Sequence, residues 1–251
     1  MIKTRWNWRL QLIIAIAVFI PIIPIDNSLR LSVSPTLYAI VRLAYVLLVA
    51  AFIYYGLGSL KVRNQKFRRT PLLITTLTIC CLPVFLFVSP LQIFGVLRSP
   101  KAVSAICLAF SGGILEEFVF RGLVFSLFQK IFVNSRWPLT FAGILSSVCF
   151  GLFHSVNLLN GQTIEATLQQ IFYATCIGLF FVVVRVSTNT LMWSALLHSL
   201  FDTQLSIGSS AGSSPWIWLF LAYVPILLVG LVGLIAMDSN LKRNQPIVKL
   251  T

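Results

Sequence analysis

The sequence predicts an all-α, polytopic membrane protein with about eight transmembrane helices and both termini in the cytoplasm. Of its 251 residues, 58% are hydrophobic and only 10% are charged, and the mean hydropathy is +0.93. Several apolar segments reach the ~20 residues that a helix needs to cross a bilayer. These runs are continuous, which favours helices over the alternating pattern of a membrane barrel. Residues 1–251 are expected to form a single integral membrane domain.

Eight apolar segments account for most of the chain. Lys3, Arg5 and Arg9 precede the first segment, and no small-residue cleavage site follows it, so we interpret it as an uncleaved first span. The predicted spans are 10–25, 36–58, 71–92, 102–128, 138–158, 164–184, 188–207 and 215–237.

The basic residues test this topology. With the amino terminus inside, fourteen of the nineteen Lys and Arg residues fall in cytoplasmic segments. Only Arg30, Arg98 and Lys101 fall outside, and Arg42 and Arg121 lie within spans. This asymmetry is the positive-inside pattern, and it explains the net charge of +13 without nucleic-acid binding. We therefore expect a lipid bilayer, and no nucleic acid, as a partner.

The five cysteines all lie in apolar runs, and none is part of a Cys-x-x-Cys pair. This placement favours small apolar packing residues over disulfide or metal roles.

Three acidic residues, both histidines and one arginine fall well inside the predicted spans. Three of the six acidic residues, Asp26, Glu165 and Asp238, fall at span ends, where a charge costs little. A charge near the bilayer centre costs at least ~2.5–3.5 kcal/mol on insertion scales, so intramembrane ionisable residues suggest a functional site. The candidate residues are Glu116, Glu117, Arg121, His154, His198 and Asp202.

Helix geometry separates the two adjacent glutamates. Glu117 and Arg121 are four residues apart and share a helix face, so they can form a charge-assisted pair. Glu116 is rotated from Glu117 by about 100° and is better placed to face a cavity. A purely structural salt bridge is the competing interpretation of the pair, but it leaves Glu116 without a partner.

The two histidines lie on later spans. His154 ends the sequence Phe150-Gly-Leu-Phe-His154, and His198 lies four residues before Asp202 on one helix face. An Asp in this position can orient an imidazole and stabilise its cation. Taken alone, each motif could instead be a structural one, in which the polar side chains only form hydrogen bonds between helices and have no catalytic role.

Together the motifs resemble the CAAX protease and bacteriocin-processing (Abi) family of intramembrane proteases. The resemblance rests on Glu116-Glu117-x-x-x-Arg121, Phe150-x-x-x-His154 and His198-x-x-x-Asp202, and it covers residues 102–206. It implies hydrolysis of a peptide bond inside the membrane, and eight spans suit the family.

The resemblance also implies roles. Glu116 would be the general base that activates a water, and His154 would hold that water with it. Glu117 and Arg121 would support Glu116, while His198 and the residue one turn later would stabilise the oxyanion. The prenyl-protein proteases of the family carry Asn in that last position, and ionised Asp202 cannot donate a hydrogen bond. We therefore expect Asp202 to orient His198 and His198 to be the oxyanion donor.

A metal-free, glutamate-type mechanism is favoured, with no cofactor. The family has been described both as metal-free and as metal-dependent, and the sequence has no His-Glu-x-x-His motif. A zinc ion held by Glu116, His154 and His198 is the alternative.

The predicted function is an intramembrane endopeptidase, with a peptide or membrane-protein substrate, in a bacterial cell membrane. The substrate could be a prenylated C-terminal peptide, a bacteriocin or pheromone precursor, or a membrane-protein segment. Two alternatives use the same residues: a non-enzymatic immunity or scaffold protein that binds a peptide in the cavity, and a proton-coupled transporter.

Overall fold

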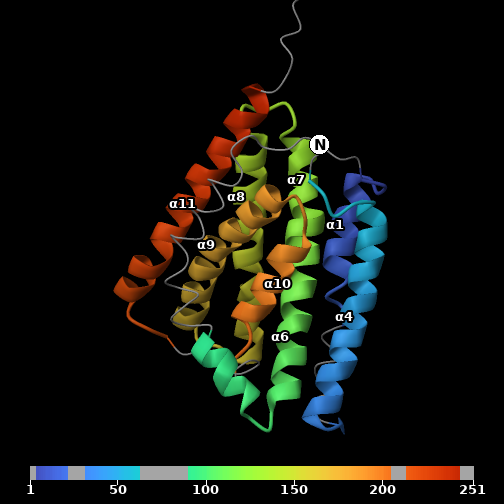
Figure 1. Ribbon diagram of the computed structural model, residues 1–251, viewed down its shortest axis with the longest axis vertical. Helices are drawn as coiled ribbons and strands as arrows, with labels where there is room; N and C mark the ends of the chain where they lie inside the picture. Colours follow the sequence, from blue (N-terminus) through green and yellow to red (C-terminus); the bar gives the residue numbers. More distant parts are fainter. Residues whose placement is uncertain (1–3, 22–31, 63–89, 205–212, 244–251) are drawn as a thin grey trace, which may run out of the picture.

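The chain folds into packed helices, and all regular secondary structure in the described residues is helical (Figure 1). The computed structural model describes residues 4–21, 32–62, 90–204 and 213–243. A short helix covers 90–97. The other elements are α1 (Trp8–Ala17), α4 (Pro35–Leu57), α6 (Ala102–Glu116), the π-helix η2 (Glu117–Val124), α7 (Phe125–Ile131), α8 (Pro138–Phe153), the 3-10 helix η3 (His154–Asn160), α9 (Ile164–Thr188), α10 (Met192–Phe201) and α11 (Trp216–Arg243).

Five described helical segments are long and apolar enough to cross a membrane, which supports an integral membrane protein. They are Pro35–Leu57, Ala102–Ile131, Pro138–Asn160, Ile164–Thr188 and Trp216–Leu241. Helices α1 and α10 are apolar but shorter. The predicted third span lies almost wholly outside the described residues. The count of eight spans and the cytoplasmic location of both termini therefore stay predictions.

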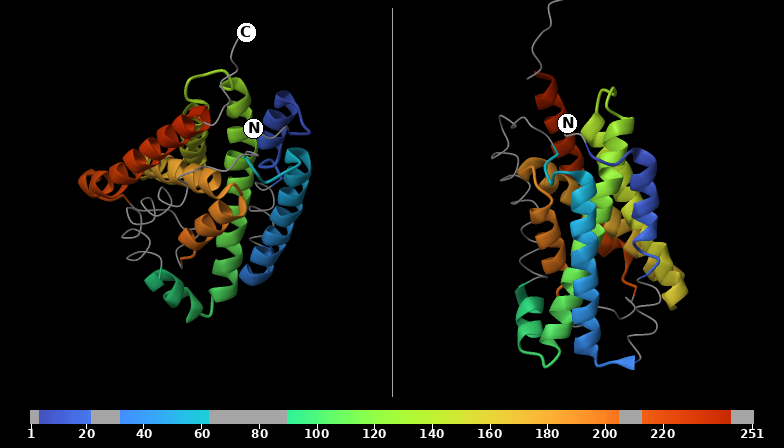
Figure 2. Two further views of the ribbon diagram at one scale, coloured as in Figure 1. Left: turned by 45° about the horizontal axis from the view of Figure 1, so that its top comes forward. Right: turned by 90° about the vertical axis from the view of Figure 1, so that its right-hand side faces the viewer.

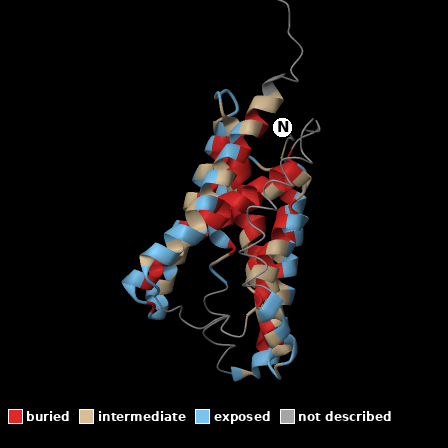
Figure 3. Ribbon diagram, turned by 60° about the vertical axis from the view of Figure 1, so that its left-hand side comes forward, coloured by how far each residue is buried: buried red, intermediate tan, exposed pale blue. Residues whose placement is uncertain are grey.

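Helix α9 lies at the centre of the assembly. Helices α8, α10 and α11 pack against it, while α4 and α10 pack against α6 (Figures 1 and 2). The buried residues concentrate where these helices converge, and exposed residues lie on the outer faces (Figure 3). Many of the exposed residues are large and hydrophobic. A wide apolar exterior is expected of helices that face lipid rather than water.

Several segments that are far apart in sequence meet at one end of the bundle. Arg5 N–H donates to the Gly56 carbonyl at 3.0 Å, and Lys130 Nζ donates to Thr4 Oγ1 at 2.6 Å. Val62 N–H donates to Asn189 Oδ1 at 3.0 Å. These bonds bring together the amino-terminal segment and the ends of α4, α7 and α9 (Figure 1). The sequence topology assigns all of these positions to the cytoplasmic side.

The sixth and seventh predicted spans have different bounds in the structure. Helix α9 continues past 184 to Thr188, so Arg185 lies in its last helical turn rather than in a connection, and its side chain is buried. Helix α10 covers only 192–201 of the predicted 188–207. The two helices are separated by Asn189, whose positive φ of 56° ends α9 in a left-handed conformation.

Asp238 also differs from its prediction as an inexpensive charge at a span end. Its side chain is 1% exposed and accepts hydrogen bonds from the amides of Leu139 and Thr140, at 3.0 and 2.9 Å, and from Thr140 Oγ1 at 2.7 Å. These amides belong to the first turn of α8, which has no intrahelical acceptor for them. The carboxylate thus caps α8 from α11.

Candidate functional site

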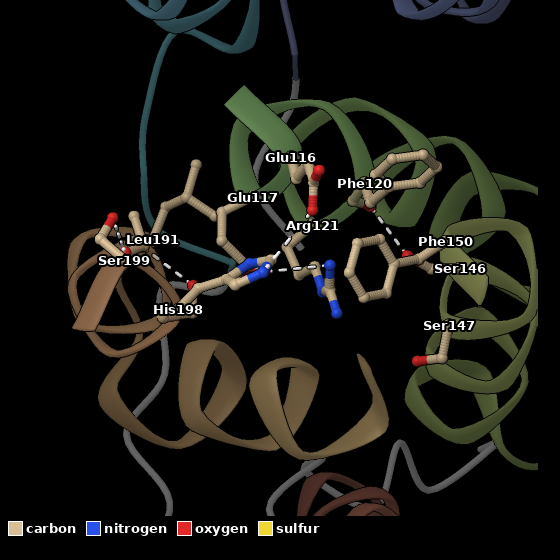
Figure 4. Close-up of polar contacts among 12 residues, drawn as sticks. Glu116, Glu117, Phe120, Arg121, Ser146, Ser147, Phe150, Leu191, His198 and Ser199 are labelled. Carbon is tan, nitrogen blue, oxygen red and sulfur yellow. Dashed lines mark hydrogen bonds and ion pairs between the residues drawn. The ribbon is translucent and has the colours of Figure 1, made fainter. Parts of the chain in front are cut away.

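The two glutamates lie at a change of helix type. Helix α6 ends at Glu116, and the π-helix η2 begins at Glu117. Segments of π-helix inside a longer helix are rare overall, and those that occur often lie at functional sites. In η2 the Phe120 carbonyl accepts hydrogen bonds from Phe125 N–H, five residues on, and from Ser146 Oγ of α8 at 2.8 Å (Figure 4). The bond from α8 therefore anchors the π-helix to its neighbour.

Glu117 contacts both an arginine and a histidine. Its Oε1 atom lies 3.0 Å from Arg121 Nη1 and 3.1 Å from His198 Nδ1 (Figure 4). The side chains of Glu117 and Arg121 are fully buried. The predicted pair between residues four apart is thus present, and it extends to a histidine on α10, 81 residues away in sequence.

The other nitrogen of His198 faces two more carboxylates. Its Nε2 atom lies 3.6 Å from Glu116 Oε2 and 3.6 Å from Asp202 Oδ2. The side chains of Glu116 and Asp202 are 20% and 28% exposed, whereas Glu117 has no exposed surface. Three carboxylates therefore surround one imidazole, and two of them reach an accessible space.

Two aromatic rings pack against Arg121 and His198. The Arg121 guanidinium carbon lies 4.1 Å from the Phe150 ring centroid and 5.4 Å from that of Phe181. His198 stacks on Phe181 with centroids 4.8 Å apart and meets Phe150 edge-on at 5.6 Å. Contacts between cations and ring faces partly replace the lost hydration of a buried charge. Phe150 and Phe181 are thus walls of the site.

Two glycines permit the close helix approaches that assemble the site. A Cβ atom on Gly113 of α6 would lie 2.6 Å from the Ser199 backbone nitrogen of α10, closer than real Cβ contacts occur. A Cβ on Gly178 of α9 would lie 3.0 Å from Arg121 Nη2. Small residues let neighbouring helix backbones approach in membrane proteins. Gly113 thereby lets the helix that carries His198 come against the two glutamates.

His154 stands apart from the other five predicted residues. It is the first residue of η3, partly buried, and its Nδ1 atom lies 2.9 Å from the Phe150 carbonyl of its own helix. Its ring centroid is 5.0 Å from that of Phe150, which in turn lies beside His198. Within the described part of the chain, no ion pair joins His154 to Glu116, Glu117 or Asp202.

The arrangement does not provide a ready metal centre. No group of three or more His, Cys, Asp and Glu side chains in the described residues could hold a metal ion. The alternative zinc set of Glu116, His154 and His198 spans three separate elements, and His198 Nδ1 is already directed at Glu117.

Comparison with known proteins identifies the segment that carries the site. Residues 98–204 match the family described as Rce1-like, type II CAAX prenyl endopeptidase Rce1-like. The match confirms the family resemblance drawn from the motifs, and it includes all six predicted site residues. No curated protein and no solved structure matches the chain. The similarity to this family therefore lies in the segment that runs from just before α6 to just after α10.

Proposed function

We propose that this protein is an intramembrane endopeptidase in which Glu116 activates a water to hydrolyse a peptide bond. The observation that carries the proposal is the difference between the two adjacent glutamates. Glu117 is fully buried and held by Arg121 and His198, whereas Glu116 is partly exposed and lies 3.6 Å from His198 Nε2. A general base needs access to water and substrate, which only Glu116 of this pair has.

His198 is the proposed oxyanion donor. Glu117 accepts from Nδ1 and fixes the orientation of the ring, which leaves Nε2 directed at the space shared with Glu116 and Asp202. An imidazolium donates from both nitrogens, and three surrounding carboxylates attract its positive charge. The ring can therefore donate to the oxygen of a tetrahedral intermediate while it stays bonded to Glu117.

His154 is proposed to help hold the attacking water. Because the Phe150 carbonyl can only accept, the neutral His154 ring carries its proton on Nδ1. Its Nε2 lone pair can then accept a hydrogen bond from water. Glu116 would remove a proton from this water as its oxygen attacks the scissile carbonyl carbon, and it would then pass that proton to the departing amine.

The proposed substrate is a membrane-associated or precursor peptide, of the prenylated or bacteriocin-like types that suit the family. The proposed mechanism is glutamate-type, with no step through a metal, and the proposed location is a bacterial cell membrane. Eight spans with both termini cytoplasmic complete the proposal.

The test compares peptide termini in membranes from cells that express the native chain or the Glu116→Gln variant at matched levels. We expect new termini only with the native chain, because loss of a general base typically costs about 10²–10⁴-fold in rate. Glu165→Gln, which removes an exposed acid in the first turn of α9, is the matched control and should cleave normally.

Identical termini from the native chain and the Glu116→Gln variant would contradict the proposal. If the variant then also gave the phenotype of the native chain, the non-enzymatic immunity or scaffold function would replace it. The same comparison with a chelator tests the metal: cleavage lost with chelator and restored by zinc would overturn the glutamate-type mechanism.

A further inference from the structure

A second polar site lies at the end of the bundle where the amino-terminal segment, the end of α4, α7 and the end of α9 meet. It is a cavity of about 30 Å³, large enough for a small polar group. It is lined by Thr4, Leu57, Ser59, Lys61, Val62, Ser126, Gln129, Lys130 and Arg185. None of the six residues of the catalytic proposal belongs to this set.

The cavity is strongly positive. Lys61, Lys130 and Arg185 contribute three cationic side chains, and no carboxylate is among the described residues that line it. Thr4, Ser59 and Ser126 add hydroxyl groups. A small cavity with three cations, several hydroxyls and no acid attracts an anion.

The donors at its base lack partners within the protein. Arg185 is 1% exposed, and its Nε and Nη1 atoms have no hydrogen-bond partner among the described residues. Gln129 is 5% exposed, and its Nε2 atom is also without one there. The Arg185 guanidinium carbon lies 5.1 Å from the Phe125 ring centroid, which supports the charge but accepts no conventional hydrogen bond. Buried donors left unsatisfied are costly, so these atoms point to an occupant that accepts from them.

The mouth of the cavity differs from its base. Lys61 is exposed, while Lys130 is partly buried and donates to Thr4 Oγ1 at 2.6 Å and to the Trp6 carbonyl at 3.1 Å. Trp6 lies at the same end, among the helix termini, where Trp commonly marks the membrane–water interface. The residues that line the cavity thus include a buried arginine and an exposed lysine.

We infer that this cavity binds a phosphate group, and that a phosphomonoester lipid at the membrane surface supplies it. The planar Arg185 fork matches two phosphate oxygens, and the Gln129 amide and Ser126 hydroxyl surround the same space. The cavity admits a head group only, and the acyl chains lie outside against the apolar helix faces. Basic pockets between helices on the cytoplasmic side recognise lipid head groups in this way.

The experiment uses the purified full-length chain in detergent and measures its thermal unfolding midpoint. The native chain is titrated with phosphatidic acid and with diacylglycerol of the same acyl chains, which differ only in the phosphate. A parallel titration uses inorganic phosphate against sodium chloride at equal ionic strength. We expect phosphatidic acid to raise the midpoint and diacylglycerol to leave it unchanged. The Arg185→Gln variant should bind at least about tenfold more weakly, because charge-assisted hydrogen bonds are lost.

Two further variants keep the test decisive. Arg98→Gln removes an exposed arginine that also contacts a ring, with its guanidinium carbon 4.1 Å from the Phe94 centroid, and it should bind like the native chain. Lys61→Gln changes an exposed side chain at the mouth and should weaken binding several-fold; if Arg185→Gln does not fold, this variant decides. Equal responses to phosphatidic acid in the native, Lys61→Gln and Arg185→Gln proteins would overturn the proposal, as would no response in the native chain. A response to inorganic phosphate that matches the lipid response would keep the phosphate site and reject the lipid as its source.

Discussion

Arg121 and Arg185 are both fully buried, but their positive charges are compensated in different ways. Both lie against a phenylalanine ring, with guanidinium carbons 4.1 Å from the Phe150 centroid and 5.1 Å from the Phe125 centroid, respectively. Arg121 also has a carboxylate of its own chain at 3.0 Å, and Arg185 has none among the described residues around its cavity.

The difference separates two kinds of site. The charge of Arg121 is neutralised inside the chain, so it can hold Glu117 and, through it, His198. Both guanidinium groups have nitrogens without a hydrogen-bond partner among the described residues, but only Arg185 has no carboxylate beside it there, and its cavity suits an anion from outside. A buried charge therefore indicates either internal support or a binding site, and its partner atoms decide which.

The largest expected effect tests this difference directly. Arg121→Met leaves the buried Glu117 without its arginine partner and should lower the free energy of unfolding by about 3–5 kcal/mol. Arg185→Met in phosphate-free and lipid-depleted detergent should change it little, because it removes donors that have no partner. Denaturant unfolding followed by tryptophan fluorescence measures both.

A double variant provides the control. Glu117→Gln combined with Arg121→Met removes both charges and should recover part of the lost stability. Equal destabilisation by Arg121→Met and Arg185→Met would contradict the distinction between the two arginines.

A smaller effect is expected from the approach of α10 to α6. Gly113→Ala would place a Cβ 2.6 Å from the Ser199 backbone nitrogen and should destabilise by about 1–3 kcal/mol through overpacking. Gly112→Ala is the matched control, since its Cβ would lie 3.5 Å from Asp202 Oδ2, an ordinary contact. The same unfolding assay compares the two, and similar stabilities would show that α10 can shift to accommodate the methyl group.

The partners of His198 allow a third, graded prediction. Asp202→Asn should slow proteolysis about tenfold, equivalent to ~1.4 kcal/mol, because Asp202 orients a ring that Glu117 also holds at 3.1 Å. His198→Gln should cost far more, since it removes the proposed oxyanion donor. Initial rates on the substrate found by terminus mapping give both values, and full activity in Asp202→Asn would reject the orienting role.

The smallest effect concerns the buried Asp238 carboxylate that caps α8. Asp238→Ala removes the acceptor for two amides at the start of α8 and should destabilise by about 1 kcal/mol, as loss of a helix cap does. Exposed Glu165→Gln should leave the unfolding midpoint unchanged. If Asp238→Ala left the stability unchanged, water would have to replace the cap, and Asp238 would have to be accessible in solution.

The sequence alone determined the membrane class and the identity of the candidate residues. Long apolar runs leave few titratable groups, so the placement of Glu116, Glu117, Arg121, His198 and Asp202 inside such runs is visible without a structure. The Glu117–Arg121 pair was also predictable, because residues four apart share a helix face and the contact is local.

Only the tertiary structure decided which atoms meet across helices. That Glu117 contacts His198, that Phe181 stacks on the same ring, and that Arg185 and Asp238 are buried depend on how α9, α10 and α11 pack. The Nδ1 atom of His154 bonds to the Phe150 carbonyl of the adjoining helix α8, and the predicted role of His154 beside Glu116 stays a prediction. The physical reason is that periodicity fixes the face on which a side chain lies, whereas its partner across the interface depends on packing between distant segments.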